Sequence, residues 1–289
     1  MPTTSAEFDA EIGNCRAVCP PRDDEALARV DVSLSKLEQL AADLAAENHR
    51  PPAMPELALP ANFKLSVVIP VYNEQATIRQ VIDNVAVLPV AKEIIVVDDA
   101  STDRTRQVLA ECEKAAEISV IYKPQNEGKG AALRTGFRRV TGDVVVVQDA
   151  DLEYDPQDIL GVIRPIALGH ADVVYGSRFL NQESAHCRGV HRFGNACLTR
   201  LSNWFTGLAI TDMETCYKAF RREVLNSFEI RQPRFGFEPE VTARIARRNY
   251  RLAEVPIRYS PRGYAEGKKI GVKDLISTLL CIVRYGLAD

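Results

Sequence analysis

Apolar and polar positions alternate in a regular rhythm from residue 64 onward. Short runs rich in valine and isoleucine predict strands, and the longer amphipathic stretches between them predict helices. The expected strands are Leu65–Val71, Glu93–Val97, Ile118–Tyr122, Asp143–Gln148 and Ala171–Tyr175, and the expected helices are Gln75–Leu88, Thr102–Ala116, Lys129–Val140 and Pro156–Leu168. This alternation predicts an α/β, Rossmann-like fold, in which helices cover both faces of a mostly parallel central sheet.

The alternation ends after Arg178. Helical segments follow, with one further strand near Leu252–Arg258 and a last amphipathic helix over Val272–Leu287. That helix either packs on the domain or lies in the interface of a membrane. Its most membrane-like stretch, Leu275–Val283, is shorter than the roughly 18–20 residues that a spanning helix needs.

The first 62 residues have a different pattern. Apolar residues recur at helical spacing between residues 25 and 47, which predicts an amphipathic helix. Several prolines between Pro51 and Pro60 then predict a linker. We therefore expect an N-terminal extension over residues 1–62 and a main domain over residues 63–289. The apolar stripe of the extension needs a partner surface, which is either a second copy of the chain, giving a homo-oligomer, or the flank of the main domain.

Composition narrows the class of protein. The 289 residues, 46% of them hydrophobic, are enough for one large globular domain with an extension. The net charge of −3 gives no global basic field, so nucleic acid is not an expected partner. Seven scattered cysteines without zinc-type spacing favour reduced thiols in a cytoplasmic protein. The first residues also lack the features of a signal peptide.

Four polar motifs follow four of the predicted strands. They are Pro70–Glu74, Asp98–Asp103, Asn126–Gly130 and Asp149–Glu153. The carboxyl ends of parallel strands meet at one edge of a sheet, where ligands bind in folds of this class. A single aspartate in such a place is often only the cap of the next helix. Four motifs on the same edge favour a binding site instead.

The motif Asp149-Ala150-Asp151 predicts a metal site. Residues two apart on an extended segment point the same way, so Asp149 and Asp151 would lie side by side, with Glu153 as a third carboxylate. Their mutual repulsion is relieved by a hard divalent cation, and Mg2+ binds through a few carboxylates together with substrate phosphates. The alternative is a cluster of acids that stabilises the start of the helix at Pro156.

The motif Gly128-Lys129-Gly130 opens a predicted helix. Glycines let a ligand approach the backbone, and the amides at a helix start favour phosphate. The segment lacks the remaining residues of a Walker A loop. An ordinary loop before a helix is therefore the alternative.

Longer segments carry a resemblance to a known family. They are VVIPVYNE, IIVVDDASTDRT, NEGKGAALRTGF, VVVQDADLEYDP, YGSRF, TDMETCYKAFRREV, FGFEPEVTARIARR and VPIRYSPRGYAEGKKIGVKD. The chain resembles the family 2 glycosyltransferases with the GT-A fold, over about residues 64 to 287. Within them it is most similar to the branch of dolichyl-phosphate mannose synthase and the polyprenyl-phosphate glycosyltransferases. The extension has no counterpart in that resemblance.

The resemblance implies roles for individual residues. The nucleotide-sugar-binding set would be Pro70, Tyr72, Glu74, Asp98, Asp99, Gly128, Lys129, Asp149, Ala150 and Asp151. Asp98 or Asp99 would bond the base, with Asp99 preferred. Asp149 and Asp151 would bind Mg2+ or Mn2+, with Glu153 as a further contact, and Arg178 would face the same cleft.

The resemblance also implies the reaction. An inverting, metal-dependent transfer would move a sugar from a donor of the GDP-mannose or UDP-glucose type to a polyprenyl or dolichyl phosphate. A hydroxyl acceptor would need a general base, and Asp212 or Glu214 could supply it. A phosphate acceptor needs cations instead, and the expected ones are Arg178, Arg262, Lys268 and Lys269. The expected catalytic set is Asp149, Asp151, Asp212, Arg178 and Arg262.

Three interpretations of the function stay open: transfer to a polyprenyl phosphate and two alternatives. The basic cluster PRGYAEGKK favours the phosphate, although it could be an ordinary surface loop, and Asp212 could be only a cap or an ion-pair partner. The first alternative is a family 2 enzyme that acts on a saccharide hydroxyl. The second is a non-catalytic nucleotide-binding scaffold subunit. A lipid-phosphate acceptor would bring a cytoplasmic enzyme to the cytoplasmic face of a membrane, either peripherally or through a membrane-subunit partner.

Overall fold

The computed structural model describes residues 59–60, 62–114, 118–180, 189–261 and 272–287. The chain divides into a first unit, residues 1–56, and a second, residues 57–289. The expected helix over residues 25–47 and the proline-rich linker lie outside the described residues. The division of the chain at residue 62 therefore stays a prediction.

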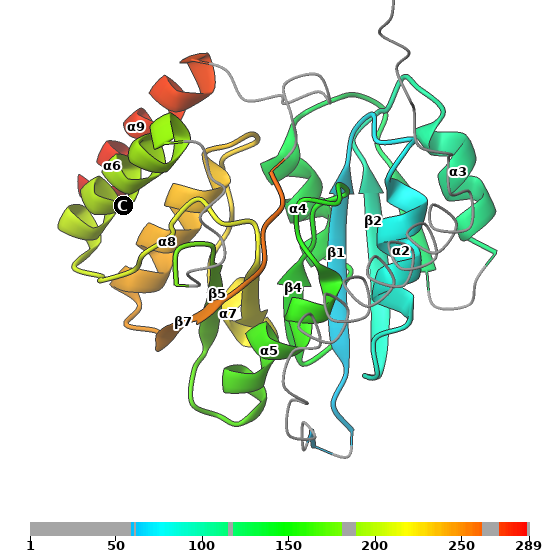
Figure 1. The fold of residues 1–289 in the computed structure, drawn as a ribbon, viewed down its shortest axis with the longest axis horizontal. Coiled ribbons are helices and arrows are strands. Elements are labelled where there is room, and N and C mark those ends of the chain that lie inside the picture. Colours follow the sequence, from blue (N-terminus) through cyan, green and yellow to red (C-terminus); the bar gives the residue numbers. More distant parts are fainter. Residues whose placement is uncertain (1–58, 61, 115–117, 181–188, 262–271, 288–289) are drawn as a thin grey trace, which may run out of the picture. The chain divides into compact units, whose positions relative to one another are not determined.

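A seven-stranded sheet forms the centre of the second unit, in the order β3-β2-β1-β4-β6-β5-β7 (Figure 1). The strands are β1 Leu65–Val71, β2 Lys92–Asp98, β3 Ile118–Tyr122, β4 Val144–Val147, β5 Val173–Ser177, β6 Lys218–Arg221 and β7 Leu252–Pro256. Strands β1 to β4 run parallel, and β5 pairs in parallel with β7. The prediction of an α/β fold with a mostly parallel sheet is confirmed.

Strand β6 was not predicted. It is antiparallel to both of its neighbours, with Phe220 in register with Val145 of β4 and with Val173 of β5. It has four residues and leads directly into a short helix, so its own pattern is too short to identify a strand. Its strand conformation is decided by the two strands that flank it.

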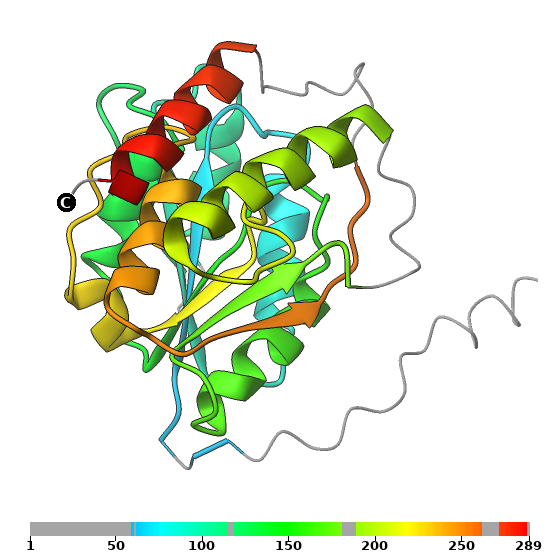
Figure 2. The same cartoon turned by 90° about the vertical axis from the view of Figure 1, so that its left-hand side faces the viewer.

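Helices lie along the sheet and beyond its end. They are α2 Ile78–Ala86, α3 Thr105–Cys112, α4 Lys129–Phe137, α5 Ile159–Ala167, α6 Gly189–Thr206, α7 Arg222–Asn226, α8 Phe237–Arg247 and α9 Val272–Leu287, with a 3₁₀ turn at Pro156–Asp158. The long helices α6 and α9 lie side by side, next to α8 (Figure 2). In the described part of the chain, every helix is too short or too polar to cross a membrane.

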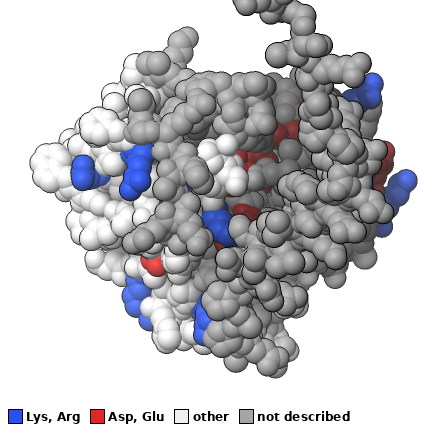
Figure 3. All heavy atoms as spheres, viewed as in Figure 1, with Lys and Arg blue, Asp and Glu red and all other residues white. Residues whose placement is uncertain are grey.

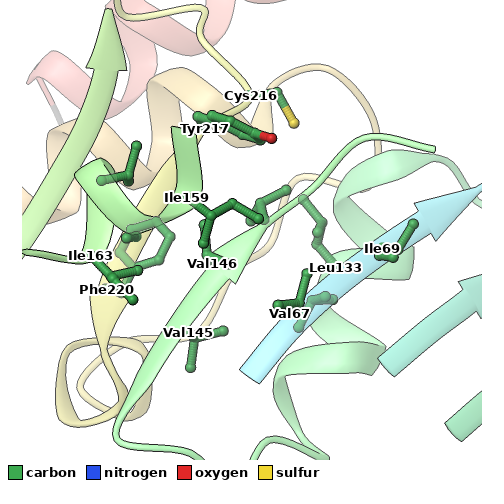
Figure 4. Packing of buried hydrophobic residues seen from close by; sticks show 14 of the residues in the cluster. Val67, Ile69, Leu133, Val145, Val146, Ile159, Ile163, Cys216, Tyr217 and Phe220 are labelled. Carbon is green, nitrogen blue, oxygen red and sulfur yellow. The ribbon is translucent and has the colours of Figure 1, made fainter. Parts of the chain in front are cut away.

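Apolar clusters on both faces of the sheet show that it is covered on both sides. Neighbouring residues of β2 belong to different apolar clusters: Ile94 and Val96 join the main core, whereas Ile95 and Val97 form a smaller cluster with Ala132 of α4. Such alternation is the period of two that a strand imposes. Figure 4 shows the main core between β1, β4 and β6 and the adjoining helices, including Val67, Val146 and Phe220.

Candidate active site

The first two polar motifs are joined at the ends of β1 and β2. Asn73 has a left-handed backbone with φ 56°, a conformation that asparagine tolerates better than most residues. Its backbone N–H donates to Ser101 Oγ (3.0 Å), and its side-chain Oδ1 accepts from the Thr102 N–H (2.8 Å). The turn after β1 is thereby held against the turn after β2.

The first and fourth motifs are joined through Thr77. Its hydroxyl lies within hydrogen-bond distance of Glu74 Oε2 (3.2 Å) and of the Ala150 carbonyl oxygen (2.9 Å). Tyr72 and Glu74 are half-buried in the same loop, and Pro70 lies near the end of β1. The structure therefore brings the expected nucleoside-pocket residues next to the Asp149–Asp151 segment.

Asp98 is fully buried and holds the turn after β2. Its carboxylate accepts from the Ser101 N–H (3.2 Å) and from Arg106 Nε (2.6 Å). Arg106 in turn donates from Nη2 to the Lys123 carbonyl oxygen (2.7 Å). Asp98 thus acts as the counter-ion of an arginine that links β2, α3 and the end of β3.

Asp99 connects the second motif to the third. Its carboxylate accepts from Lys123 Nζ (2.7 Å), from the Gly128 N–H (2.6 Å) and from the Glu127 N–H (3.1 Å). Asp99 therefore fixes the loop that precedes α4, which carries the expected nucleotide contacts Gly128 and Lys129. The preference for Asp99 over Asp98 as the residue that bonds the base stays a prediction.

The glycines of the third motif lie against a neighbouring backbone segment, residues 232–234. A side chain at Gly128, where φ is 99°, would meet the Pro233 carbonyl oxygen and Arg234 Cγ at 2.6 Å, and one at Gly130 would collide with the Gln232 carbonyl oxygen. The Ala131 N–H at the helix start donates to the Pro233 carbonyl oxygen (2.9 Å). The glycines therefore admit the segment 232–234, and this first-turn amide already has a protein partner.

Lys129 lies between two acidic groups. Its Nζ is 3.1 Å from Asp149 Oδ1 and 3.3 Å from Glu238 Oε1. Burial alone would lower the pKa of Lys129, but Asp149 and Glu238 raise the pKa well above its ordinary value. Glu238 lies in the first turn of α8 and was missed as a site residue, because nothing near it in the sequence shows that α8 reaches the start of α4.

The Asp149–Glu153 segment follows β4 and does not assemble the expected third metal ligand. Glu153 Oε2 accepts from the Tyr259 hydroxyl (2.9 Å). Among the described residues, no three acidic, histidine or cysteine side chains are grouped to hold a metal ion. Asp149 and Asp151 still fit a cation that takes its remaining ligands from a diphosphate and water. Figure 3 shows acidic side chains gathered near the middle of this face.

Arg178 and Asp212 form a bidentate ion pair. Arg178 donates from Nε to Oδ2 and from Nη2 to Oδ1, both at 2.7 Å, and its backbone N–H also donates to Oδ2 (3.1 Å). Asp212 is fully buried and also accepts from Asn195 Nδ2 (3.1 Å). Burial alone would lower the pKa of Arg178, but Asp212 raises the pKa well above its ordinary value. The ion-pair alternative for Asp212 is therefore what the structure shows.

Tyr259 places this ion pair beside the fourth motif. The Arg178 guanidinium lies over the Tyr259 ring, 5.1 Å from its centroid. The same tyrosine bonds to Glu153 through its hydroxyl and packs on the ring of Tyr154, 5.2 Å between centroids. Tyr259 was not identified from the sequence. The remaining expected cations, Arg262, Lys268 and Lys269, lie outside the described residues.

A buried charged cluster behind the site was also not foreseen. Lys218 is fully buried and donates from Nζ to the carbonyl oxygens of Met213 (2.8 Å) and Thr215, and burial lowers its pKa. In the described part of the chain, Glu214 Oε1 is buried without a hydrogen-bond partner. Burial, followed by the charge of Glu238, raises the pKa of Glu214 to about 8.

Replacing Glu214 by glutamine should change how stability depends on pH. Folded Glu214 keeps its proton up to about pH 8, whereas an exposed glutamate loses it near 4.5. Between these values the folded state binds more protons, so the parent's free energy of unfolding falls as pH rises. Glutamine cannot ionise, so we expect the Tm of Glu214→Gln, relative to the parent, to increase by a few degrees from about pH 5 to about pH 8.

The control for this measurement is Glu113→Gln, at an exposed carboxylate. Thermal unfolding of the three proteins across this pH range separates the effect of Glu214 from the effects of other groups. A Tm difference between Glu214→Gln and the parent that stays constant over the range would contradict the raised pKa of Glu214.

Comparison with known proteins shows what the chain is similar to. A family model described as "Glycosyl transferase family 2" matches residues 66–228. An undecaprenyl-phosphate 4-deoxy-4-formamido-L-arabinose transferase of Pseudomonas fluorescens (strain SBW25) is 33% identical over 243 residues, which are 78% of this chain and 69% of the relative. The protein of that name from Sodalis glossinidius (strain morsitans) is 33% identical over 211 residues, which are 71% of this chain and 62% of the relative.

Solved structures share the fold. Glucosyl-3-phosphoglycerate synthase from Mycobacterium tuberculosis, in complex with Mn2+, uridine-diphosphate-glucose and phosphoglyceric acid, matches with a TM-score of 0.64 and 23% identity, over 83% of this chain and 87% of that chain. Another crystal structure of that M. tuberculosis enzyme matches with a TM-score of 0.61 and 26% identity, over 77% of this chain and 81% of that chain. These likenesses confirm the fold that the resemblance implied.

Proposed function

The chain belongs to glycosyl transferase family 2, and on this basis we propose that it transfers a sugar, with inversion, from a nucleotide sugar to a polyprenyl phosphate. The observation that carries the proposal is the Arg178–Asp212 pair beside the Asp149–Glu153 segment. Asp212, one of the two acids that could have served as a general base, is fully buried as the counter-ion of an arginine. The other, Glu214, keeps its proton at neutral pH, because burial raises its pKa to about 8. A phosphate acceptor needs a fixed cation at this place and no base.

The donor side of the reaction rests on Asp149, Asp151 and Lys129. A bound Mg2+ or Mn2+ would offset the negative charge that builds on the leaving diphosphate. Asp149 and Asp151 would hold that cation. Lys129 neutralises Asp149 (3.1 Å). With a cation bound to Asp149, the Lys129 ammonium would be available to bond a diphosphate oxygen. The Mn2+ named in the M. tuberculosis structure supports a divalent cation.

The acceptor side rests on Arg178. Its guanidinium is fixed by two bonds to Asp212 and by the ring of Tyr259, so a phosphate meets a preorganised cation. The names of the bacterial relatives support an undecaprenyl-phosphate type of acceptor. Arg262, Lys268 and Lys269 remain proposed as further contacts with the acceptor phosphate.

A second candidate function is transfer to a hydroxyl group, as on a saccharide. The observation that favours it is the likeness to an enzyme crystallised with phosphoglyceric acid. Phosphoglyceric acid is a small soluble molecule that carries a hydroxyl group. Transfer to a hydroxyl requires a free general base, but Asp212 is bound to Arg178 by two hydrogen bonds, and Glu214 keeps its proton at neutral pH because its pKa is raised to about 8. Membership of an enzyme family argues against the third interpretation, a non-catalytic scaffold.

A lipid-borne acceptor would bring the enzyme to a membrane surface, and peripheral association with its cytoplasmic face is part of the proposal. A membrane-subunit partner and a homo-oligomer formed through residues 25–47 are the further associations proposed.

The direct test is a transfer assay with the purified full chain. Nucleotide sugars of the GDP-mannose, UDP-glucose and UDP-N-acetylglucosamine types are incubated with a short polyprenyl phosphate and Mg2+ or Mn2+. We expect a glycolipid with at least one donor. Release of free sugar alone, or transfer only to saccharides, would contradict a polyprenyl-phosphate acceptor.

Replacing Asp99 by asparagine should weaken nucleotide binding. The substitution removes charged hydrogen bonds to the loop before α4, and such bonds contribute about 1.5–3 kcal/mol each. We therefore expect the dissociation constant of UDP or GDP to rise roughly tenfold or more, as measured by calorimetry. Asp98→Asn is compared in the same experiment, with Glu113→Gln as a surface control. Parent-like affinity in both aspartate variants would rule out a role for this pair.

A further inference from the structure

Helix α6 carries an exposed stripe on its outer side. Phe193 and Trp204 are 70% and 76% exposed, and Cys197 and Arg200 between them are exposed as well. Spacings of four, three and four residues place these four side chains on one face of a helix. Large aromatic residues that are exposed together on one face of a helix are typical of a protein or membrane interaction surface.

Helix α9 carries a second exposed apolar face. Its exposed side chains are Leu275, Ile276, Leu279, Leu280, Val283 and Leu287, and its buried side chains are Thr278, Cys281, Ile282 and Tyr285. At 100° per residue the exposed set falls within one arc, on the other side from the buried set. The amphipathic pattern predicted from the sequence therefore exposes its apolar side, while a partly polar side packs inward.

The two faces belong to one surface. Helices α6 and α9 are in contact and lie on the same side of the second unit, as Figure 2 shows. Gly286 allows the contact, because a side chain there would meet Phe205, the neighbour of Trp204, at 2.6 Å. We name the exposed residues of these two helices the α6–α9 face.

Charge indicates the kind of partner. Helix α6 has no acidic residue in its sequence, and α9 has one, Asp274. Arg192, Arg200 and Arg284 are exposed along the two helices. In Figure 3 the surface over α6 and α9 is mainly white with blue side chains. Exposed apolar and aromatic residues combined with arginine are the composition of a helix that lies in the interface of an anionic bilayer.

We propose that the α6–α9 face docks on an anionic lipid bilayer, with Phe193, Trp204 and Leu280 inserted at the level of the headgroups. The inference rests on the proposed function, since a lipid-borne acceptor requires the enzyme to reach a membrane. A second copy of the chain would bury the apolar residues but would bring the arginines of both copies together. The bilayer satisfies both the apolar residues and the arginines.

Helix α6 also links this face to the acceptor site. On its inner side, Asn195 donates to Asp212 (3.1 Å), and Thr199 Oγ1 accepts from the Met213 N–H (3.1 Å). An α-helix with its side chains is about 10–12 Å across. Docking through the outer side of α6 therefore places the Arg178–Asp212 pair about one helix diameter from the membrane surface. The phosphate of a polyprenyl phosphate can reach the pair over that distance while the polyprenyl chain stays in the bilayer.

Trp204 can serve as an intrinsic fluorescent probe of the α6–α9 face, because the chain contains a single tryptophan. The full chain is mixed with vesicles of phosphatidylcholine, with or without phosphatidylglycerol, and tryptophan emission and co-sedimentation are followed. We expect emission to shift to shorter wavelength and the protein to sediment with the anionic vesicles. Vesicles that carry a quencher in the headgroup region should quench Trp204.

The test variant is the double substitution Phe193→Asp and Leu280→Asp, which keeps Trp204. Removing two large apolar contacts and adding two negative charges should raise the lipid concentration for half-maximal binding roughly tenfold or more. The matched control is Val87→Asp, at a position 71% exposed just after α2. Nucleotide binding and thermal unfolding of all three proteins check that they are folded.

The outcomes separate docking from the proposed reaction. The double variant should still transfer sugar to a short, water-soluble polyprenyl phosphate and lose transfer to vesicle-bound acceptor. Unshifted Trp204 emission with anionic vesicles, or equal vesicle binding by parent and double variant, overturns the docking proposal. If the parent is a dimer that does not bind vesicles and the double variant is a monomer, the face binds a second copy of the chain instead. Vesicle binding without transfer to any polyprenyl phosphate would refute the proposed function and leave docking standing.

Discussion

Sugar transfer should fall roughly 10²- to 10³-fold or more when Asp151 is replaced by alanine, while the protein stays folded. Asp151 follows β4 beside Asp149, at the edge where the four polar motifs meet. The expected loss arises because the departing diphosphate gains negative charge in the transition state, and a cation held by two aspartates would offset it. Initial rates with saturating donor, together with the Mn2+ affinity of parent and variant, measure the effect.

Glu153→Gln is the matched control for this experiment. Glu153 is only two residues away, but its carboxylate bonds to the Tyr259 hydroxyl, so we expect its loss to reduce the rate far less. A similar loss in both variants would show that Glu153 binds the metal after all, as the resemblance implied. Full activity of the parent in excess EDTA would refute the metal-dependent mechanism.

Replacing Arg178 by alanine should weaken use of the acceptor roughly 100-fold, with a much smaller effect on nucleotide binding. The acceptor phosphate and the donor diphosphate are both anions and must come within bonding distance. Two unit charges 4 Å apart repel by about 4 kcal/mol at an effective dielectric constant near 20. Arg178 offsets part of that repulsion from a position fixed by Asp212 and Tyr259. The ratio kcat/KM for the polyprenyl phosphate measures the loss.

Asp212→Asn decides between the two kinds of acceptor. Asparagine can still accept a hydrogen bond from Arg178, which also stays stacked on Tyr259, so substantial activity should remain. Arg192→Ala, at an exposed arginine, is the matched control for loss of a positive charge, with a short soluble acceptor as the substrate. Abolished transfer in Asp212→Asn beside near-normal transfer in Arg178→Ala would reverse the assignment and identify Asp212 as the base for a hydroxyl acceptor.

Local pattern alone was enough to predict the frame of this protein. The valine-rich runs that became β1, β2 and β4 and the amphipathic stretches that became α2, α5 and α9 follow from side-chain period and burial, which neighbouring residues encode. The same reasoning placed the four polar motifs on one edge, because parallel strands end together. Helix ends were less predictable: the helix expected over Thr102–Ala116 is Thr105–Cys112 in the structure. At its start, the Asp103 side chain accepts from the Thr105 N–H, and residues 102–104 lie in the loop before the helix.

The tertiary structure decided which of these groups meet. Tyr259 reaches Glu153 across 106 residues, Glu238 reaches Lys129 from α8, and Asp212 becomes the partner of Arg178. The glycines of the third motif admit residues 232–234, although the local sequence suggested room for a ligand. Strand β6 exists because β4 and β5 flank it. Such pairings depend on how distant elements pack, and spacing along the chain carries no record of that packing. The sequence by itself therefore determined most strands of the sheet, the edge where the motifs lie and the kind of chemistry. Packing between distant elements decided the place of β6, which charges are paired and which apolar face stays exposed.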